Sequence, residues 1–324
     1  MILGQDRAID QFASAWATRK LHHAWLLAGR HGVGKATFAH AAARRILADA
    51  AGPVSKLPGI ESDDDHPIVK LVEAGSHPDM RVLERLVNEK TGNLERNISV
   101  DQVRSLAELF DLSPAMSDWW VVIIDSVDEL EPAGANALLK MLEEPPPNSV
   151  FFLVSHAPGR LLPTIRSRCR RLDFQSLDDD VMTSVLETEA PGISPAERKK
   201  IVAMAFGSVG RALAFAELGL AKLEDAAVAI LRQGDPTNAR RSDLASELGK
   251  RGAGDRYAAF LELAPSLIAR EARQLEGASR ERALDAYAKA RELAAVAPRV
   301  SLDPAATIFQ LGGILAAVAD SPLP

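Results

Sequence analysis

The chain has 324 residues, a length that usually forms two or three domains. Hydrophobic residues make up 47% and charged residues 25%, which is typical of a folded globular protein and excludes a disordered or collagen-like chain. The net charge of −6 argues against a protein that holds DNA by its overall charge. A single cysteine, Cys169, excludes an internal disulfide and a multi-cysteine zinc site.

One cysteine also fits a reducing compartment, so we expect a cytoplasmic protein. The sequence contains no run of 18 apolar residues, so we expect no contact with a membrane. The first residues, MILGQDRAIDQF, lack the apolar core of a signal peptide, and none is expected.

Helical and extended patterns alternate through the first part of the chain. Helices are predicted at 5–18, 35–47, 100–110 and 133–142, and buried strands at 24–28, 121–124 and 150–154. Asp101 is expected to cap the third helix, and the Gly-, Pro- and Asp-rich segment 50–95 to be a surface insertion. Strands that alternate with helices predict an α/β fold with a parallel sheet covered on both faces.

After Asp173 the strand patterns stop. Residues 177–220 predict short helices, and from residue 222 the chain is helical in pattern throughout. One apolar stripe of the last segment contains Tyr257, Phe260, Leu261, Ala264, Leu267 and Ile268. We therefore expect three domains, over residues 1–173, 174–221 and 222–324.

Residues 29–37 read GRHGVGKAT, in which Gly29, Gly34 and Lys35 match a phosphate-binding loop. Glycines let backbone N–H groups turn toward phosphate oxygens, and the lysine adds a positive charge. A strand before the loop and a helix after it are the context that this motif requires. The residues predicted to bind nucleotide in this loop are Gly29, Gly32, Gly34, Lys35 and Thr37.

The final position of this motif is Ala36, which has no hydroxyl for Mg²⁺. Thr37 carries a hydroxyl, but one residue further along a helix it points roughly 100° away. Asp125, which ends the strand VVIID, fits a magnesium-orienting carboxylate. We therefore expect at most weak nucleotide binding and poor hydrolysis, and no resident metal is predicted.

An ATP-hydrolysing site of this class would place a glutamate after Asp125 to activate water. The residue at this position is Ser126. Asp128 and Glu129 follow, and we expect them to form the solvated start of a helix. Two catalytic parts are thus missing, which indicates a degenerate ATP site.

Four segments together resemble the clamp-loader branch of the AAA+ ATPases, in particular bacterial DNA polymerase III subunits. They are the loop 29–37, VVIID (121–125), NALLKMLEEPP (136–146) and RSRC (166–169). GSHPD (75–79) and ISVDQVR (98–104) are similar to the delta prime subunits of this family. The resemblance covers about residues 3–213. It implies an AAA+ P-loop domain, a helical lid and a helical collar for the three expected domains.

The resemblance also implies a ring of five subunits with ATP at the subunit interfaces. The partners would be the gamma/tau ATPase subunits and the delta subunit, and, through the complex, the sliding clamp and primed DNA. In this family the arginine of the S-R-C motif, here Arg168, reaches the ATP of a neighbouring subunit and stabilises charge in the transition state. Ser155 stands where a polar sensing residue belongs, and is equally plausible as an ordinary strand end.

Three features depart from the family pattern. Ala36 and Ser126 replace residues of the active ATPases, so the chain is expected to need no cofactor, to bind ATP or ADP weakly if at all, and not to be an ATPase on its own. Many relatives carry a four-cysteine zinc module at 50–75, where this chain has no cysteine, so no zinc is expected. Arg211 lies one place after the position of a second sensing arginine, which argues against that role.

The favoured interpretation is a regulatory stator subunit of the delta prime type. The first alternative is an active gamma/tau-type ATPase subunit, against which Ala36 and Ser126 argue. The second is a DNA-binding AAA+ protein that acts alone in recombination or repair, which the negative net charge disfavours. The helices after residue 222 would join subunits, form an ordinary helical core, or do both.

Overall fold

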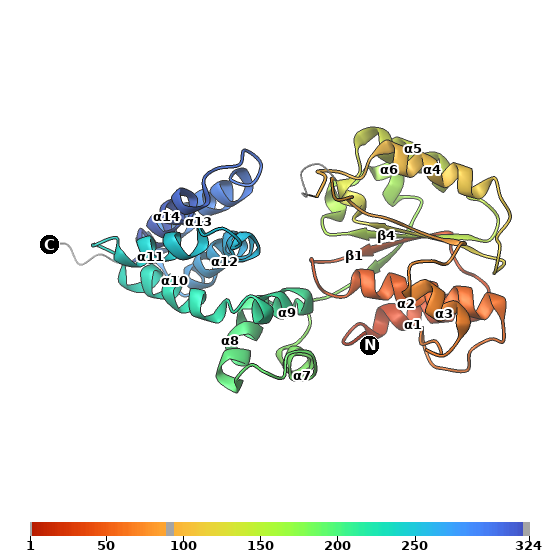
Figure 1. The fold of residues 1–324 in the computed structure, drawn as a ribbon, viewed down its shortest axis with the longest axis horizontal. Helices are drawn as coiled ribbons and strands as arrows, with labels where there is room; N and C mark the ends of the chain where they lie inside the picture. Colours follow the sequence, from red (N-terminus) through yellow and green to blue (C-terminus); the bar gives the residue numbers. More distant parts are fainter. Residues whose placement is uncertain (1, 89–93, 320–324) are drawn as a thin grey trace. The chain divides into compact units, whose positions relative to one another are not determined.

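The computed structural model describes residues 2–88 and 94–319. The chain divides into two compact units, Met1–Asp178 and Asp179–Pro324. The first is an α/β unit with a five-stranded parallel sheet, which confirms the expected fold class, and the second consists of helices and loops (Figure 1). The further division of the helical part at residue 221 stays a prediction.

The sheet of the first unit has the strand order β2-β3-β4-β1-β5, and all four neighbouring pairs are parallel. Its strands are β1 Ala24–Ala28, β2 Met80–Leu83, β3 Trp120–Asp125, β4 Ser149–Ser155 and β5 Arg170–Asp173. β1, β3 and β4 confirm the three predicted strands. Because every strand runs in the same direction, all the carboxyl ends lie at one edge of the sheet and all the amino ends at the other.

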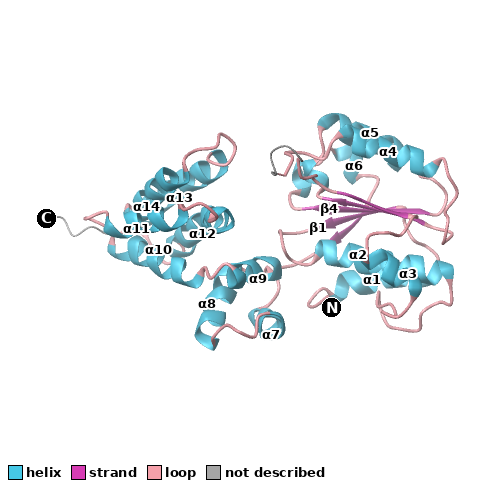
Figure 2. Cartoon of the chain, viewed as in Figure 1, coloured by secondary structure: helices cyan, strands magenta, loops and turns pink. Residues whose placement is uncertain are grey.

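Helices cover both faces of this sheet (Figure 2). On one face lie α1 Asp6–Ala17, α2 Lys35–Ala51 and α3 Pro67–Glu73; on the other lie α4 Val100–Phe110, α5 Pro132–Glu143 and α6 Pro163–Arg166. Two apolar clusters, one for each face, contain alternate residues of the central strands. Burial on both faces explains why these strands are continuous apolar runs in the sequence.

The prediction that residues 50–95 form a surface insertion was wrong in part, because this segment contains α3 and the edge strand β2. Residues 89–93 of that segment lie outside the described residues. β2 and β5 are only four residues long and expose two and three of them, so neither has an apolar run that sequence patterns could detect. The predicted N-cap of α4, Asp101, was also wrong. Ser99 caps this helix, in a capping box with Gln102.

A buried guanidinium holds the chain between α2 and α3. The side chain of Arg45 is 10% exposed, and its Nε donates to Asp49 at 2.7 Å. Its terminal nitrogens donate to the carbonyl oxygens of Ser55, Leu57 and Glu61, each at 2.8 Å. One arginine on α2 therefore satisfies three backbone carbonyls of an irregular segment.

The GSHPD segment contains a buried carboxylate, Asp79, that holds a neighbouring loop in place. Asp79 is fully buried and accepts hydrogen bonds from the backbone N–H groups of Ala115, Met116 and Ser117, at 2.6, 2.9 and 2.8 Å. Its own N–H donates to Nδ1 of His77 at 3.1 Å. Asp79 thus fastens the loop after α4 at the point where the chain enters β3.

We expect the Asp79→Ala substitution to lower the free energy of unfolding by about 3 kcal/mol, because it leaves three buried or partly buried N–H groups without an acceptor. Urea unfolding of the full chain measures this. The matched control is Asp118→Ala, at an exposed aspartate of the same loop, which should change stability by less than about 0.5 kcal/mol. Equal effects of the two substitutions would contradict the role assigned to Asp79.

The second unit contains eight described helices. They are α7 Asp179–Glu189, α8 Pro195–Ala205, α9 Val209–Glu217, α10 Ala221–Gln233, α11 Ala239–Leu248, α12 Gly254–Ala272, α13 Gly277–Val296 and α14 Pro304–Ala316. The predicted stripe lies on α12, where all its members except the half-buried Tyr257 are buried. Within the described part of the chain, no helix combines the length and the apolar character needed to cross a membrane.

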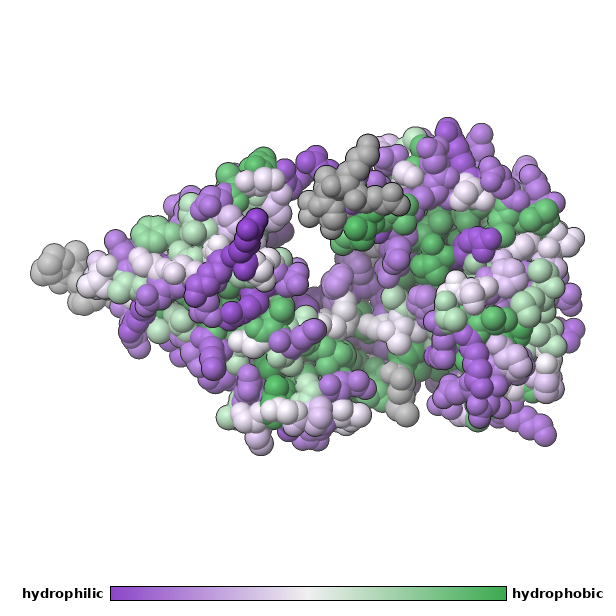
Figure 3. Space-filling model, in the orientation of Figure 1, coloured by the Kyte–Doolittle hydropathy of each residue, from purple (hydrophilic) through white to green (hydrophobic). Residues whose placement is uncertain are grey.

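The surface of each unit is of mixed polarity. On the face drawn in Figure 3, hydrophilic and hydrophobic residues are interspersed over both units. Exposed large apolar side chains of the second unit include Leu284, Val296, Val300, Leu302 and Phe309, from α13, α14 and the loop between them. An oligomerisation role for this unit stays a prediction.

Candidate nucleotide site

The loop between β1 and α2 has a backbone conformation that depends on its glycines. Gly32 and Gly34 have φ values of 74° and 95°, which favour glycine. A Cβ atom on Gly29 would lie 2.5 Å from the carbonyl oxygen of Phe174, so only glycine fits against the chain after β5. Gly34 is the N-cap of α2 and makes no side-chain cap, which leaves the N–H groups of the first helical turn for an anion.

Lys35 is 2% exposed and bonds the backbone of its own loop. Its Nζ donates to the carbonyl oxygens of Gly29, at 2.8 Å, and Arg30. Burial lowers the pKa of Lys35 to about 8, against the opposing effect of Asp125 and Asp128. The lysine therefore already has hydrogen-bond acceptors within the chain.

Two of the remaining predicted residues lie at the ends of other strands of the sheet. Asp125 ends β3 and Ser155 ends β4, at the carboxyl edge of the sheet beside Gly29, whose N–H donates to the Ser155 carbonyl at 3.3 Å. Burial raises the pKa of Asp125, an effect that Lys35 and two histidines oppose. Thr37 lies exposed on the first turn of α2.

Asp128 is not the solvated residue that the sequence led us to expect. Its carboxylate accepts hydrogen bonds from the hydroxyls of Ser126, at 2.9 Å, and Ser155, at 2.8 Å, and from the His156 N–H at 2.5 Å. The hydroxyl of Ser155 is therefore directed at a carboxylate of its own chain. Glu129 likewise forms an ion pair with Arg85, at 2.9 Å.

Two histidines beside the loop escaped the sequence analysis. The rings of His31, within the loop, and His156, just after β4, have centroids 4.7 Å apart. Burial, with the charges of Lys35 and His31, lowers the pKa of His156 to about 4, so this imidazole is neutral near pH 7. The only signal in the sequence was a histidine at each of two positions that the topology makes adjacent.

We expect His156 to make the protein less stable on acidification. Its pKa is lower in the folded chain than in the unfolded chain, so the unfolded chain binds more protons between pH 6.5 and 4. Stability should fall as the pH drops through this window, by about 1 kcal/mol from this residue once partial exposure is allowed for. Urea unfolding from pH 7 to 4 should show a shallower slope for His156→Gln, and an unchanged slope would contradict the assignment.

Arg168 lies away from this loop, at the opposite edge of the sheet. It precedes β5, in which Arg170 pairs with Trp25 of β1. From Trp25 to Gly29 the strand alone rises about 13 Å. The Arg168 side chain contacts α5 and α6 residues: Nη2 lies 2.7 Å from the carboxylate of Glu143, and Nη1 donates to the Thr164 carbonyl at 3.0 Å.

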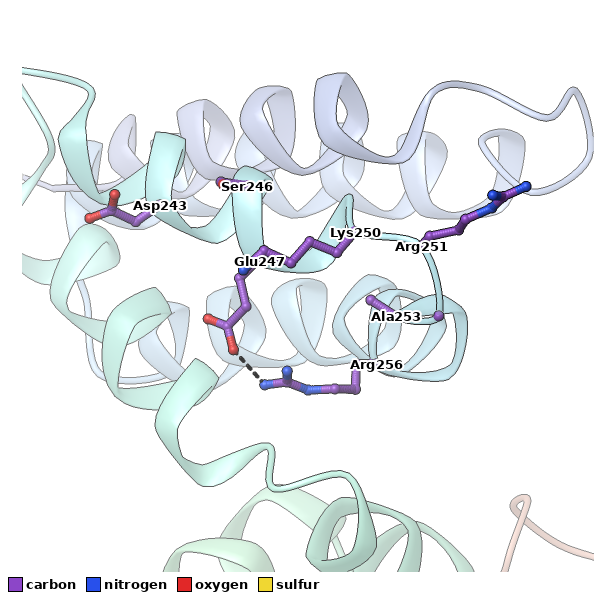
Figure 4. Close-up of a pocket in the computed structure, with 8 residues that line it drawn as sticks. Asp243, Ser246, Glu247, Lys250, Arg251, Ala253 and Arg256 are labelled. Atoms are coloured by element: carbon purple, nitrogen blue, oxygen red, sulfur yellow. Dashed lines mark hydrogen bonds and ion pairs between the residues drawn. The ribbon is translucent and has the colours of Figure 1, made fainter.

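Two further features lie outside this site. Arg211, on α9, packs its guanidinium over the rings of Phe206 and Phe215, at 6.0 and 5.3 Å from their centroids. A cavity of about 490 Å³ in the second unit is lined by residues of α11, α12 and the loop between them (Figure 4). It contains the 2.8 Å ion pair of Glu247 and Arg256 and holds none of the predicted site residues.

The family model and the curated relatives that match this chain are DNA polymerase III subunits. A family model described as DNA polymerase III, delta subunit, matches residues 4–178. DNA polymerase III subunit delta' of Pseudomonas aeruginosa is 38% identical over 150 residues, which cover 45% of this chain and 41% of that protein. Subunit delta' of Haemophilus influenzae is 32% identical over 192 residues, covering 59% and 53%.

Subunit gamma of Buchnera aphidicola is 31% identical over 218 residues, covering 65% of this chain and 56% of that protein. The chain thus spans about half the length of the curated relatives it matches. Among solved structures, a DNA polymerase III gamma subunit-related protein of Thermotoga maritima has a TM-score of 0.47 at 16% identity, over 95% of this chain and 98% of that one.

Proposed function

Since this chain belongs to the delta' family of DNA polymerase III subunits, we propose that it is the stator of a clamp loader. In this role it supplies Arg168 to the ATP site of a neighbouring ATPase subunit while its own site stays inactive. The expected partners are gamma/tau-type ATPase subunits and a delta subunit. Through that complex it would act on a sliding clamp and primed DNA in replication.

One observation carries this proposal: Arg168 and the phosphate-type loop belong to opposite edges of one parallel sheet. An arginine at the amino edge is too far from its own loop to help ATP bound there. It is half-buried, with 34% of its side chain exposed, so a surface that docks on this edge could reach it. A guanidinium held against a γ-phosphate stabilises the charge that develops there, which is worth 10³-fold or more in rate.

The residues of the chain's own site support an inactive role. The loop amides could receive phosphate oxygens, but Ala36 supplies no magnesium ligand and Ser126 no base. The hydroxyl of Ser155 and the amine of Lys35 are bonded within the chain, so a nucleotide would have to displace these contacts. Gly29, Gly32, Gly34, Lys35, Thr37, Asp125 and Ser155 therefore form a weak or vestigial nucleotide site.

We predict that Arg168→Ala leaves the fold intact and removes the share of the complex's ATP turnover that depends on the site facing this chain. Turnover at that site should fall about 10³-fold. The measurement is phosphate release by the chain mixed with the ATPase subunit, the delta subunit, clamp and primed DNA. Arg168→Lys should also lose most of this share, because an ammonium lacks the planar fork of donors.

Thermal unfolding and size-exclusion chromatography of the mixture serve as controls for folding and assembly. A complex that contains Arg168→Ala, assembles normally and turns over ATP and loads clamps at the full rate would contradict the proposed role of this arginine.

A second prediction concerns the chain's own site. The single substitution Ala36→Ser should give no ATP turnover by the isolated chain, because Ser126 still supplies no base. Phosphate release by the purified variant, with the unsubstituted chain as control, measures this. Turnover above that control would contradict the inference that two separate parts are missing.

The similarity to gamma subunits keeps an active ATPase subunit as the second candidate. ATP turnover by the unsubstituted chain alone distinguishes the two functions. A silent chain that stimulates turnover in the mixture supports the stator, and robust turnover by the chain alone supports the ATPase.

A further inference from the structure

Arg168 is held by two elements that come from different parts of the sequence. Its Nη2 lies 2.7 Å from the Oε1 atom of Glu143, the last residue of α5. Its Nη1 donates to the carbonyl oxygen of Thr164 on α6 and, at 3.4 Å, to the hydroxyl of Ser167. The ion pair spans 25 residues of sequence, whereas the other two contacts are local to the arginine. Glu143 therefore gives the Arg168 side chain a contact with α5, an element outside its own loop.

Glu143 is itself fixed at the amino edge of the sheet. The carbonyl oxygen of Leu142, the residue before it, lies 3.1 Å from Nε2 of His23, and the backbone carbonyl of His23 accepts from Phe151 of β4 at 2.8 Å. The side chain of Leu142 is buried in the core between α5 and the sheet. The end of α5 is thus attached to the beginning of β1 and β4, and Glu143 extends from this fixed point.

We propose that Glu143 is a positioning residue that orients the Arg168 guanidinium for the neighbouring subunit's phosphate. This inference rests on the proposed role of Arg168 in trans. An arginine has several rotatable bonds, and holding its head in one place before docking removes part of the ordering cost from the reaction. Glu143 needs no contact with the nucleotide to have this effect.

The ion pair of Glu143 and Arg168 lies at the surface, so it contributes little to the stability of the chain. About half of the Glu143 side chain and a third of the Arg168 side chain are exposed. An exposed pair of this kind adds little to the free energy of unfolding. Removing Glu143 should therefore change the activity of the assembled complex without changing the stability of the chain, which separates positioning from a structural role.

The test measures the Arg168-dependent turnover, defined for each complex as its ATP turnover minus that of the same complex with Arg168→Ala added. Glu143→Ala should lower this quantity about tenfold, and Glu143→Gln, which keeps an acceptor oxygen, by less. The KM for ATP of the remaining turnover should stay the same, because the arginine acts in the transition state. Combining Glu143→Ala with Arg168→Ala should add nothing to Arg168→Ala alone.

Glu144→Ala is the matched control, since it removes the same charge from an exposed neighbour at the end of the same helix. It should leave turnover at the unsubstituted level. Equal effects of Glu143→Ala and Glu144→Ala, or a rise in turnover with Glu143→Ala, would overturn the positioning role while leaving that of Arg168 intact. Full turnover by the Arg168→Ala complex would instead overturn the proposed function and this inference together.

Discussion

The single direction of the five strands is the constraint on which the rest of the first unit depends. A parallel sheet has two chemically different edges. At the carboxyl edge lie the glycine loop, Asp125 and Ser155, and at the amino edge lies the loop that carries Arg168. One sheet can therefore present a glycine loop of the phosphate-binding type on one side and an arginine on the other.

The strands that could be predicted from the sequence are those formed by continuous apolar runs. β1, β3 and β4 are buried on both faces, so each is a continuous apolar run. β2 and β5 escaped because these edge strands are only four residues long and expose charged residues such as Arg171. Gly29 to Lys35 could be identified as a loop because the motif is contiguous, and the same holds for the Ser-Arg-Cys segment.

The contacts around Asp128 could not be predicted, because they join residues up to 28 positions apart in the sequence. No local sequence pattern indicates that Ser126, Ser155 and the His156 amide all donate hydrogen bonds to one carboxylate. The same limit applies to Glu143, which belongs to an apparently ordinary helix end until the fold brings Arg168 beside it. Local patterns indicate which elements form, whereas the partners of polar side chains follow from the topology.

The segment after α2 illustrates how a small region without regular structure can be kept in place. Arg45 donates to three carbonyl oxygens there and bonds Asp49 within its own helix. A guanidinium carries its charge at every physiological pH. Loss of this one side chain would therefore leave three carbonyl oxygens of the segment without their hydrogen-bond donor.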